Sequence, residues 1–331
     1  MARRFIVASI LCTTLLLSTA SLASTKKVVF IRYPIPTSHF TTVVDGFKKT
    51  MTQRGFVEGQ QIEYFDILTR SADTSSVPDV MAAVAEWQNK ADMIVTCGWV
   101  SMSARPLLKE SNTPQLFVPV LDSVALKMLP TLTQPPGTNL SGLYLMYPPE
   151  KILRLVRLLI PQLINYAYIF DSRVPADMVF KSAYEQLPAE RLHGVTIHFL
   201  DLAGGVEPVL NALKTLRIEA FGGIVGSFQF RKELARSGLP VITSFTLDIE
   251  EEDLAQHVQE GNIVAGLYNP FRYSGEQAAE MTADIFTGKN TLAQSIPRPS
   301  KQIAFINLLT ANRLGLHVPF TALESVDMVI K

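Results

Sequence analysis

The sequence predicts an α/β protein made of two Rossmann-like lobes, each a parallel sheet flanked by helices. The chain has 331 residues, of which 47% are hydrophobic and 18% charged, so its apolar content is ample for a buried core. Single cores rarely grow beyond about 250 to 300 residues, which favours two lobes. From residue 27 onward, short β-branched or aromatic runs alternate with helical patterns, as parallel βαβ units require. The same order begins again after a turn-rich stretch at 133–139, which is expected to cross between the lobes.

The first lobe is predicted to contain four strands and two helices. The apolar periodicity of the second helix repeats at i, i+3, i+4 and i+7 from Val80, and the first helix is followed by Gly55, a residue that commonly ends helices. We expect strands at 28–33, 61–68, 93–96 and 115–120, and helices at 38–54 and 79–90.

The second lobe repeats this element order without a detectable sequence repeat. We expect strands at 166–171, 195–200, 220–225 and 240–243, helices at 150–159, 177–187, 207–216 and 229–237, and then a strand at 263–268, a helix at 274–287 and a strand at 303–306. Elements left over after two complete lobes imply that the chain crosses back, so several segments are expected to join the lobes as a hinge. The predicted division is a signal peptide at 1–23, a first lobe at 24–141 plus 264–289, and a second lobe at 142–263 plus 290–331.

The first 23 residues have the layout of a cleaved secretory signal. Two arginines, Arg3 and Arg4, precede an apolar run at 5–17, and Ser21-Leu22-Ala23 forms a small-x-small cleavage site. The alternative is an uncleaved membrane anchor, which needs about 20 strongly apolar residues, and serines and threonines dilute this run. The sequence therefore predicts a periplasmic protein.

Two cysteines are present, Cys12 and Cys97, and removal of the signal leaves one. No intrachain disulfide is then possible, although export permits disulfides. Cys12 follows Leu11 rather than a small residue, which argues against a lipid-modified signal. Cys97 follows a predicted strand, and a small buried thiol is favoured over a nucleophile because no partner histidine is identifiable.

Charge balance and missing motifs weigh against several classes of function. The 30 basic and 30 acidic residues cancel, so binding of nucleic acid through bulk charge is disfavoured. Nucleophile-elbow, phosphate-loop, zinc-protease and dinucleotide motifs are all missing from the sequence. We therefore expect no enzymatic activity, no cofactor and no metal.

The residues that follow the predicted strands form the candidate ligand site, because ligands of open parallel sheets lie beyond the carboxyl ends of the strands. These positions are rich in aromatic rings, which offer flat apolar surfaces, and in short hydroxyls near helix N-termini, which favour an anion. For any single aromatic residue, ordinary packing is the alternative. The candidates are Tyr33, Ser38, His39, Phe40, Cys97, Gly98, Trp99, Ser101, Asp122, Asp171, Arg173, Ser227, Phe228, Ser244 and Tyr268.

This mixture suits a zwitterion with a sizeable apolar side chain. Asp122 and Asp171 each follow a predicted strand, so either could hold a ligand ammonium, and Arg173 or Arg272 could bind a carboxylate with both nitrogens. The alternative for all four is a salt bridge between the lobes or a solvated loop.

Several segments resemble the periplasmic substrate-binding proteins of ABC importers, specifically the type I branch that includes tryptophan- and tyrosine-binding members. The resemblance covers essentially the whole mature chain. It is carried by Thr113-Pro114-Gln115-Leu116-Phe117-Val118-Pro119-Val120-Leu121-Asp122-Ser123-Val124, by Pro135-Pro136-Gly137-Thr138-Asn139-Leu140-Ser141-Gly142, by 153–161, and by Ile306-Asn307, 311–316 and Pro319. The family usually has Asp-Pro where this chain has Asp122-Ser123, and a smaller residue at Trp99. These differences concern the ligand more than the fold.

The resemblance implies a two-lobed clamshell that binds a small ligand between its lobes, delivers it to an ABC permease in the inner membrane and performs no chemistry on it. By position, the family would bind its ligand through the loops at 35–40, 98–101 and 171–173 and through Asp122 and Ser227. We expect an amino acid or related aromatic compound as ligand, and a monomeric protein.

Two other functions use the same clamshell. A sensory module would present ligand occupancy to a receptor or kinase, and a periplasmic enzyme would alter the ligand in the cleft. A transcriptional repressor of similar shape is disfavoured because an export signal stands where a helix-turn-helix headpiece would be.

Overall fold

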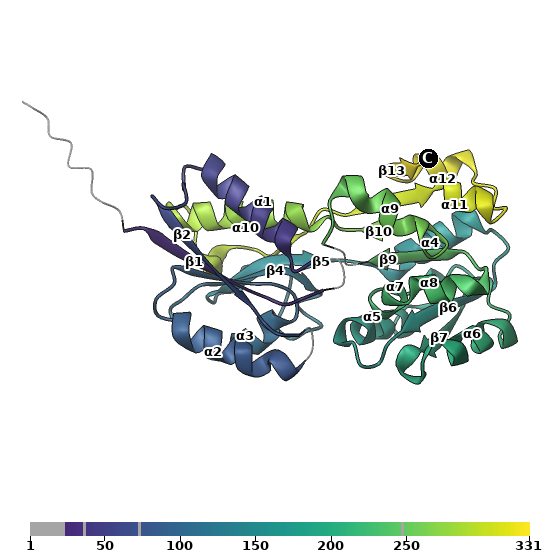
Figure 1. The fold of residues 1–331 in the computed structure, drawn as a ribbon, viewed down its shortest axis with the longest axis horizontal. Helices are drawn as coiled ribbons and strands as arrows, with labels where there is room; N and C mark the ends of the chain where they lie inside the picture. The colour runs from purple at the N-terminus through teal and green to yellow at the C-terminus, as the bar shows by residue number, and fades with distance from the viewer. Residues whose placement is uncertain (1–23, 36–37, 72–73, 246–247) are drawn as a thin grey trace, which may run out of the picture.

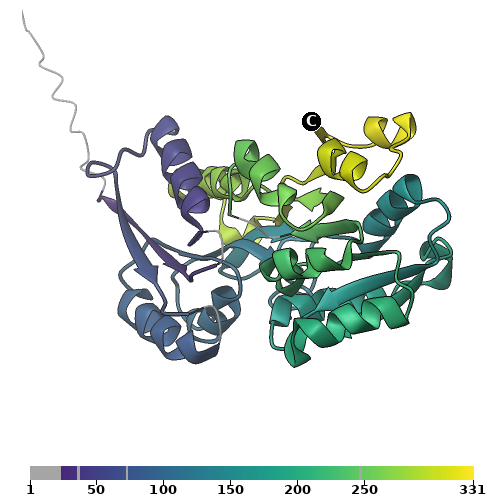
Figure 2. The same cartoon turned by 45° about the vertical axis from the view of Figure 1, so that its right-hand side comes forward.

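The computed structural model describes residues 24–35, 38–71, 74–245 and 248–331, and shows two α/β lobes side by side (Figure 1). The predicted signal peptide at 1–23, including Cys12, lies outside the described residues. The C-terminus lies on the second lobe, as both views show (Figures 1 and 2). The predicted α/β class with two sheet-based lobes is confirmed.

The first lobe is a six-stranded parallel sheet in the order β11-β5-β4-β3-β1-β2. Alternate residues of a strand point to opposite faces, and here both faces are covered. Val28 and Phe30 pack with α1, whereas Val29 and Ile31 pack with α2 and α3. The elements are β1 (Lys26–Arg32), α1 (Thr41–Gln53), β2 (Ile62–Leu68), α2 (Val77–Trp87), β3 (Met93–Thr96), α3 (Val100–Leu108), β4 (Gln115–Leu121), β5 (Leu140–Leu145), α10 (Phe271–Phe286) and β11 (Arg298–Pro299).

The second lobe is a seven-stranded sheet in the order β13-β12-β10-β9-β8-β6-β7, parallel except where β10 meets β12. Tyr166 and Tyr168 of β6 pack with α4 and α5, whereas Ala167 and Ile169 pack with α6. The elements are α4 (Pro149–Leu159), β6 (Asn165–Phe170), α5 (Pro175–Glu185), β7 (Thr196–Asp201), α6 (Val206–Thr215), β8 (Ala220–Gly222), α7 (Gly226–Gln229), α8 (Arg231–Leu234), β9 (Val241–Phe245), α9 (Leu254–Gln259), β10 (Ile263–Tyr268), β12 (Ile303–Asn307), α11 (Leu308–Arg313), α12 (Phe320–Glu324) and β13 (Met328–Ile330).

Three short segments, 146–148, 269–270 and 300–302, cross between the lobes. They are bonded to one another: the buried side-chain amide of Asn269 donates to the carbonyl of Lys301 at 2.6 Å, and the side-chain amide of Gln302 donates to the carbonyl of Met146. A ligand-driven movement of the lobes would therefore pivot on a bonded set of strands.

The strand pairings move the predicted lobe boundaries. The segment 142–145 belongs to β5 of the first lobe, 264–268 to β10 of the second, and 290–299 returns to the first lobe through β11. The turn-rich stretch 133–139, predicted as the crossing, stays in the first lobe. It is fixed there because the Asn139 amide donates to the carbonyls of Leu108, Ser111 and Thr113.

Other predicted elements differ in detail. The helix predicted at 229–237 is broken into α7, α8 and a 3₁₀ turn. The helix α3 was not predicted because Pro106 lies inside it, and a proline usually argues against a helix interior. The short elements α9 and β13 were also missed.

The helices α1 and α10 of the first lobe pack unusually closely, and both views show them side by side (Figures 1 and 2). A Cβ added to Gly275 would lie 2.0 Å from the carbonyl oxygen of Val43. A Cβ added to Gly46 would lie 2.5 Å from the carbonyl oxygen of Arg272. Glycine at these two positions lets the two backbones touch.

Candidate ligand site between the lobes

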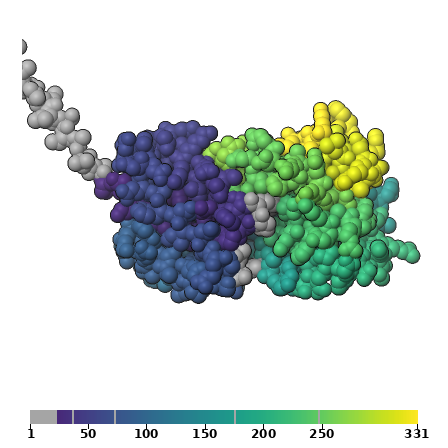
Figure 3. Space-filling view, in the orientation of Figure 1, coloured from purple at the N-terminus to yellow at the C-terminus, as the bar shows by residue number. Residues whose placement is uncertain are grey.

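A cavity of about 510 Å³ opens between the two lobes beside the first crossing segment. Figure 3 shows the two lobes meeting along a furrow. The volume of the cavity falls within the range of small-molecule sites, about 300 to 1,000 Å³. The lining comes from the loop after β4, from the end of β5 and the crossing, and from α5: Asp122, Ala125, Leu145, Met146, Tyr147, Pro148, Pro149, Met178, Val179, Phe180, Ser182, Ala183 and Gln186.

Asp122 is the charged residue of this cavity. It directly follows β4, and its Oδ1 accepts the backbone N–H groups of Val124 at 3.1 Å and Ala125 at 3.0 Å. These bonds hold the carboxylate at the cavity wall. Among the described residues, its Oδ2 has no hydrogen-bond partner, so this oxygen is available to a ligand.

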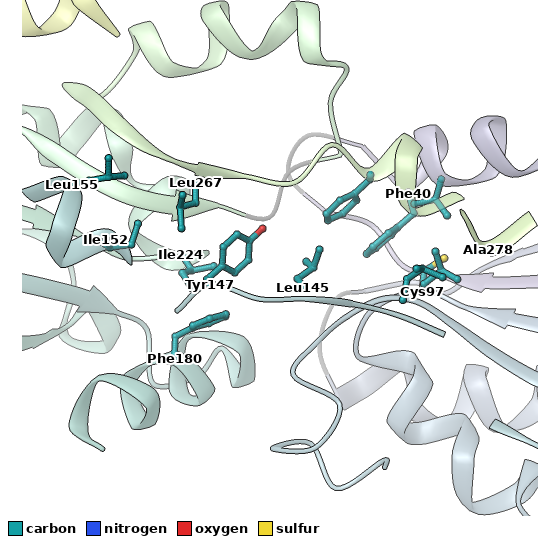
Figure 4. Packing of buried hydrophobic residues seen from close by; sticks show 14 of the residues in the cluster. Phe40, Cys97, Leu145, Tyr147, Ile152, Leu155, Phe180, Ile224, Leu267 and Ala278 are labelled. Atoms are coloured by element: carbon teal, nitrogen blue, oxygen red, sulfur yellow. The ribbon is translucent and has the colours of Figure 1, made fainter. Parts of the chain in front are cut away.

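The crossing side of the cavity is aromatic. The hydroxyl of Tyr147 donates to the carbonyl of Phe245 at 2.7 Å, and its ring lies 5.5 Å from that of Phe180 (Figure 4). Burial raises the pKa of Tyr147 well above its usual value, so the phenol stays neutral. Tyr147 therefore links the crossing segment to the end of β9.

Most of the lining was missed by the sequence reasoning. Asp122 is the one predicted site residue that lines this cavity. Met178 and Phe180 lie on α5 rather than just beyond a strand, and Met146 and Tyr147 follow β5, which was not predicted. A prediction of β5 would have placed Met146 and Tyr147 at a strand end.

The predicted aromatic residues of the first lobe come together in a cluster of their own. The ring of Tyr33 lies 5.0 Å from that of Phe40 and 5.6 Å from that of Trp99. Gly98 has a φ of 59°, and a Cβ there would collide with the Tyr33 ring. Cys97 beneath them is fully buried, and burial raises the pKa of its thiol, so the thiol stays protonated. These contacts account for the cluster as packing at the strand ends.

Ser101 is committed to the protein interior. It is fully buried, and its hydroxyl donates to the carbonyl of Thr96 at 3.0 Å. We expect Ser101→Ala to lower the free energy of unfolding by about 1 kcal/mol, because a buried carbonyl loses its partner. Chemical denaturation measures this change. Ser103→Ala in the same helix is the control, since the Ser103 hydroxyl makes no hydrogen bond among the described residues, and an equal loss in both variants would contradict the assignment.

Asp171 and Arg173 form an ion pair with each other. Asp171 is buried, and the guanidinium of Arg173 reaches its two carboxylate oxygens at 2.8 and 2.6 Å. The hydrogen bonds from the Arg173 side chain hold the pKa of Asp171 below its usual value. The pair closes within one loop, so the buried Asp171 carboxylate is not left for a ligand ammonium.

The remaining predicted residues of the second lobe lie away from the large cavity. The hydroxyl of Tyr268 donates to the carbonyl of Ile249 at 2.5 Å. Ser227 and Phe228 line a separate void of about 10 Å³, which is room for about one water molecule. Ser244 is buried.

Ser38 and His39 precede α1, where a residue of the second lobe meets the first. Asp248 follows β9, and its Oδ1 accepts the backbone N–H of Thr42 at 3.2 Å as well as the Thr42 hydroxyl. The hydroxyl of Ser38 also bonds to Asp248, whereas His39 is exposed. Burial raises the pKa of Asp248. Sequence reasoning missed this residue because it lies three positions beyond its strand.

A second carboxylate that was not predicted, Asp177, lies near the start of α5. It is fully buried and accepts three backbone N–H groups, from Asp171 at 2.9 Å, Val225 at 2.9 Å and Gly226 at 3.0 Å. Burial raises its pKa to about 6. The signal that could have revealed it is an aspartate in the first turn of a helix that begins with a proline.

Comparison with known proteins gives structural but no sequence matches. No protein-family model and no curated protein matches the chain. Three solved structures align with 92 to 93% of this chain, and the alignments cover almost the whole length of each of them. A conserved domain protein from Vibrio cholerae matches with a TM-score of 0.75 and 17% identity over 92% of this chain and 99% of its own. An ABC domain in complex with L-Trp from Streptococcus pneumoniae matches with a TM-score of 0.74 and 17% identity over 93% of this chain and 100% of its own. A substrate-binding protein with adhesive properties from Clostridium difficile, in its ligand-free, open structure, matches with a TM-score of 0.70 and 19% identity over 92% of this chain and 99% of its own.

The agreement extends over both lobes and the crossings between them. The chain has the type I periplasmic-binding-protein fold. In this periplasmic-binding-protein fold the 510 Å³ cavity has walls from both lobes.

The described part of this fold lacks two kinds of feature. Within it, no group of three or more histidine, cysteine, aspartate or glutamate side chains is arranged to hold a metal ion. Nor does this part contain a helix whose length and apolar character would let it cross a membrane.

Proposed function

We propose that this protein is the solute-binding component of an ABC importer. It binds a small organic solute, an amino acid or related aromatic compound, between its lobes and delivers it to a permease in the inner membrane. It works in the periplasm as a monomer after its signal peptide is removed. The observation that carries the proposal is the cavity of about 510 Å³, whose walls come from both lobes and from the crossing between them.

A cavity shared by two hinged lobes couples binding to closure. Asp122 and Ala125 belong to the first lobe, Met178 and Phe180 to the second. A solute that touches both walls has higher affinity for the closed arrangement, so it shifts the population toward that state. Closure around a solute is the signal that a permease can read.

Mass spectrometry of small molecules released by denaturing the purified mature protein tests the proposal first. An unchanged solute is expected, and a solute recovered in altered form would indicate an enzyme instead. A thermal-shift screen of amino acids, aromatic amines, nucleosides and sugars supports it, because a ligand at about 100 times its Kd adds roughly 2.7 kcal/mol of stability.

Variants locate the binding site. Met178→Ala and Asp122→Ala are expected to weaken the binding of the recovered solute about tenfold or more, since each removes a wall group of the cavity. Lys214→Ala, an exposed position on α6, is the matched control. Unchanged affinity in both cavity variants would show that the solute binds elsewhere.

A further inference from the structure

The charges around the cavity indicate which solutes it accepts. We propose that the site selects an organic cation without a carboxylate, an amine with an apolar body, over the corresponding α-amino acid. This inference rests on the proposed function and narrows its ligand class.

The first observation is that the cavity wall carries one kind of charge. Among the described residues, Asp122 is the single charged residue that lines the cavity, and its Oδ2 is unbonded. The other polar lining groups, Ser182 and Gln186, are neutral. An ammonium group pairs with this carboxylate, whereas a carboxylate placed in the same cavity meets repulsion and no countercharge.

The second observation is independent of the first: positions near the cleft that could receive a carboxylate are already filled by the protein's own carboxylates. The N-terminus of α1 would attract an anion through its unbonded N–H groups. Asp248 of the second lobe occupies it, through the N–H and hydroxyl of Thr42.

The same holds for two positions on the second lobe. The N–H groups of Val225 and Gly226 converge as an anion-binding concavity, and Asp177 accepts both. The charge of Arg173 is already paired, because both oxygens of Asp171 accept from its Nε and Nη2 atoms. A ligand carboxylate at the N–H groups of Val225 and Gly226 would have to displace Asp177, which would leave a buried acid without its partners.

The remaining wall suits the apolar body of an amine. Met146 and Met178 are flexible thioethers that adapt to a ligand's shape, and both are exposed at the cavity. Tyr147 and Phe180 add aromatic faces, which attract a cation as well as apolar surface.

Matched ligand pairs that differ in one carboxylate test the proposal. Isothermal titration calorimetry of tryptamine against tryptophan, and of phenethylamine against phenylalanine, measures the preference directly. We expect the better-binding amine to have a Kd about tenfold or more below that of its amino acid, the size of an unfavourable charge contact of about 1.4 kcal/mol. Asp122→Asn is expected to weaken amine binding about tenfold or more. The asparagine keeps the Oδ1 acceptor for Val124 and Ala125, so the loop should hold its shape, and an unchanged thermal midpoint checks this.

The outcomes separate this inference from the proposed function. Tryptophan or phenylalanine that binds as tightly as its amine overturns the inference and leaves the solute-binding function intact. Amine binding that Asp122→Asn does not weaken also overturns it. Failure of all four compounds to bind, together with no recoverable solute, overturns the inference and the proposed function together.

Discussion

Replacing Gly275 with alanine is expected to destabilise the first lobe by about 3 kcal/mol or more, the upper end of what overpacking costs. The new Cβ would stand 2.0 Å from the carbonyl oxygen of Val43, a backbone atom of the facing helix. A side chain could rotate away, but here α1 and α10 must separate, and both belong to the main core of this lobe. Chemical denaturation followed by circular dichroism measures the loss.

Gly204→Ala is the matched control for this experiment. Gly204 lies in the second lobe with no heavy atom within 4 Å of an added Cβ, and its φ is not positive. The same chemical change should therefore leave the free energy of unfolding within about 0.5 kcal/mol of the parent. A Gly275→Ala protein as stable as Gly204→Ala would mean that the two helices are farther apart than described.

Asp177 is expected to make the stability of the second lobe fall as the pH rises. Burial raises its pKa from 3.8 to about 6, so the folded protein holds this proton more tightly than the unfolded chain does. The contribution is fully present below about pH 4 and is lost as the pH rises through about 6. A shift of about two pKa units corresponds to about 3 kcal/mol.

The measurement compares the parent with Asp177→Asn, which carries no titratable group at this position. Between about pH 4 and pH 7, the free energy of unfolding of the parent should fall by about 2.5 kcal/mol relative to the variant. The neighbouring carboxylate Asp171 is present in both proteins, and its own titration largely cancels in the difference. Parallel pH curves for the two proteins would rule out a raised pKa at Asp177.

The sequence predicted the parts of the fold that follow from periodicity. Buried strands such as β3 and β6 are short uninterrupted apolar runs, and helices such as α4 and α10 have an apolar stripe. The strand β5 escaped because Gly142 in its middle looks like a turn residue. In the structure that glycine is required by contact, since a Cβ there would lie 2.1 Å from the carbonyl oxygen of Phe117.

The candidate site was predictable to a smaller extent, for a geometric reason. Reading past each strand found Asp122, because the end of a strand is a local property of the sequence. The opposite wall comes from the side of α5 and from the crossing, and their approach depends on how the lobes are joined. Asp171 pairs with Arg173 because of the conformation of their loop, and Asp248 bonds to the start of α1 because the two lobes touch there. Sequence periodicity predicts neither contact.

The three crossings between the lobes also govern the order in which a nascent chain can fold. The first lobe contains α1 from near the start of the chain and its packing partner α10 at Phe271–Phe286, and its sheet is completed by β11 at Arg298–Pro299. A ribosome-bound chain that stops before residue 271 would expose the apolar face of α1. Its first lobe therefore closes only after nearly the whole polypeptide has been synthesised. Contacts between such distant segments slow folding, so the protein is expected to remain loosely structured for longer than a chain with contiguous domains.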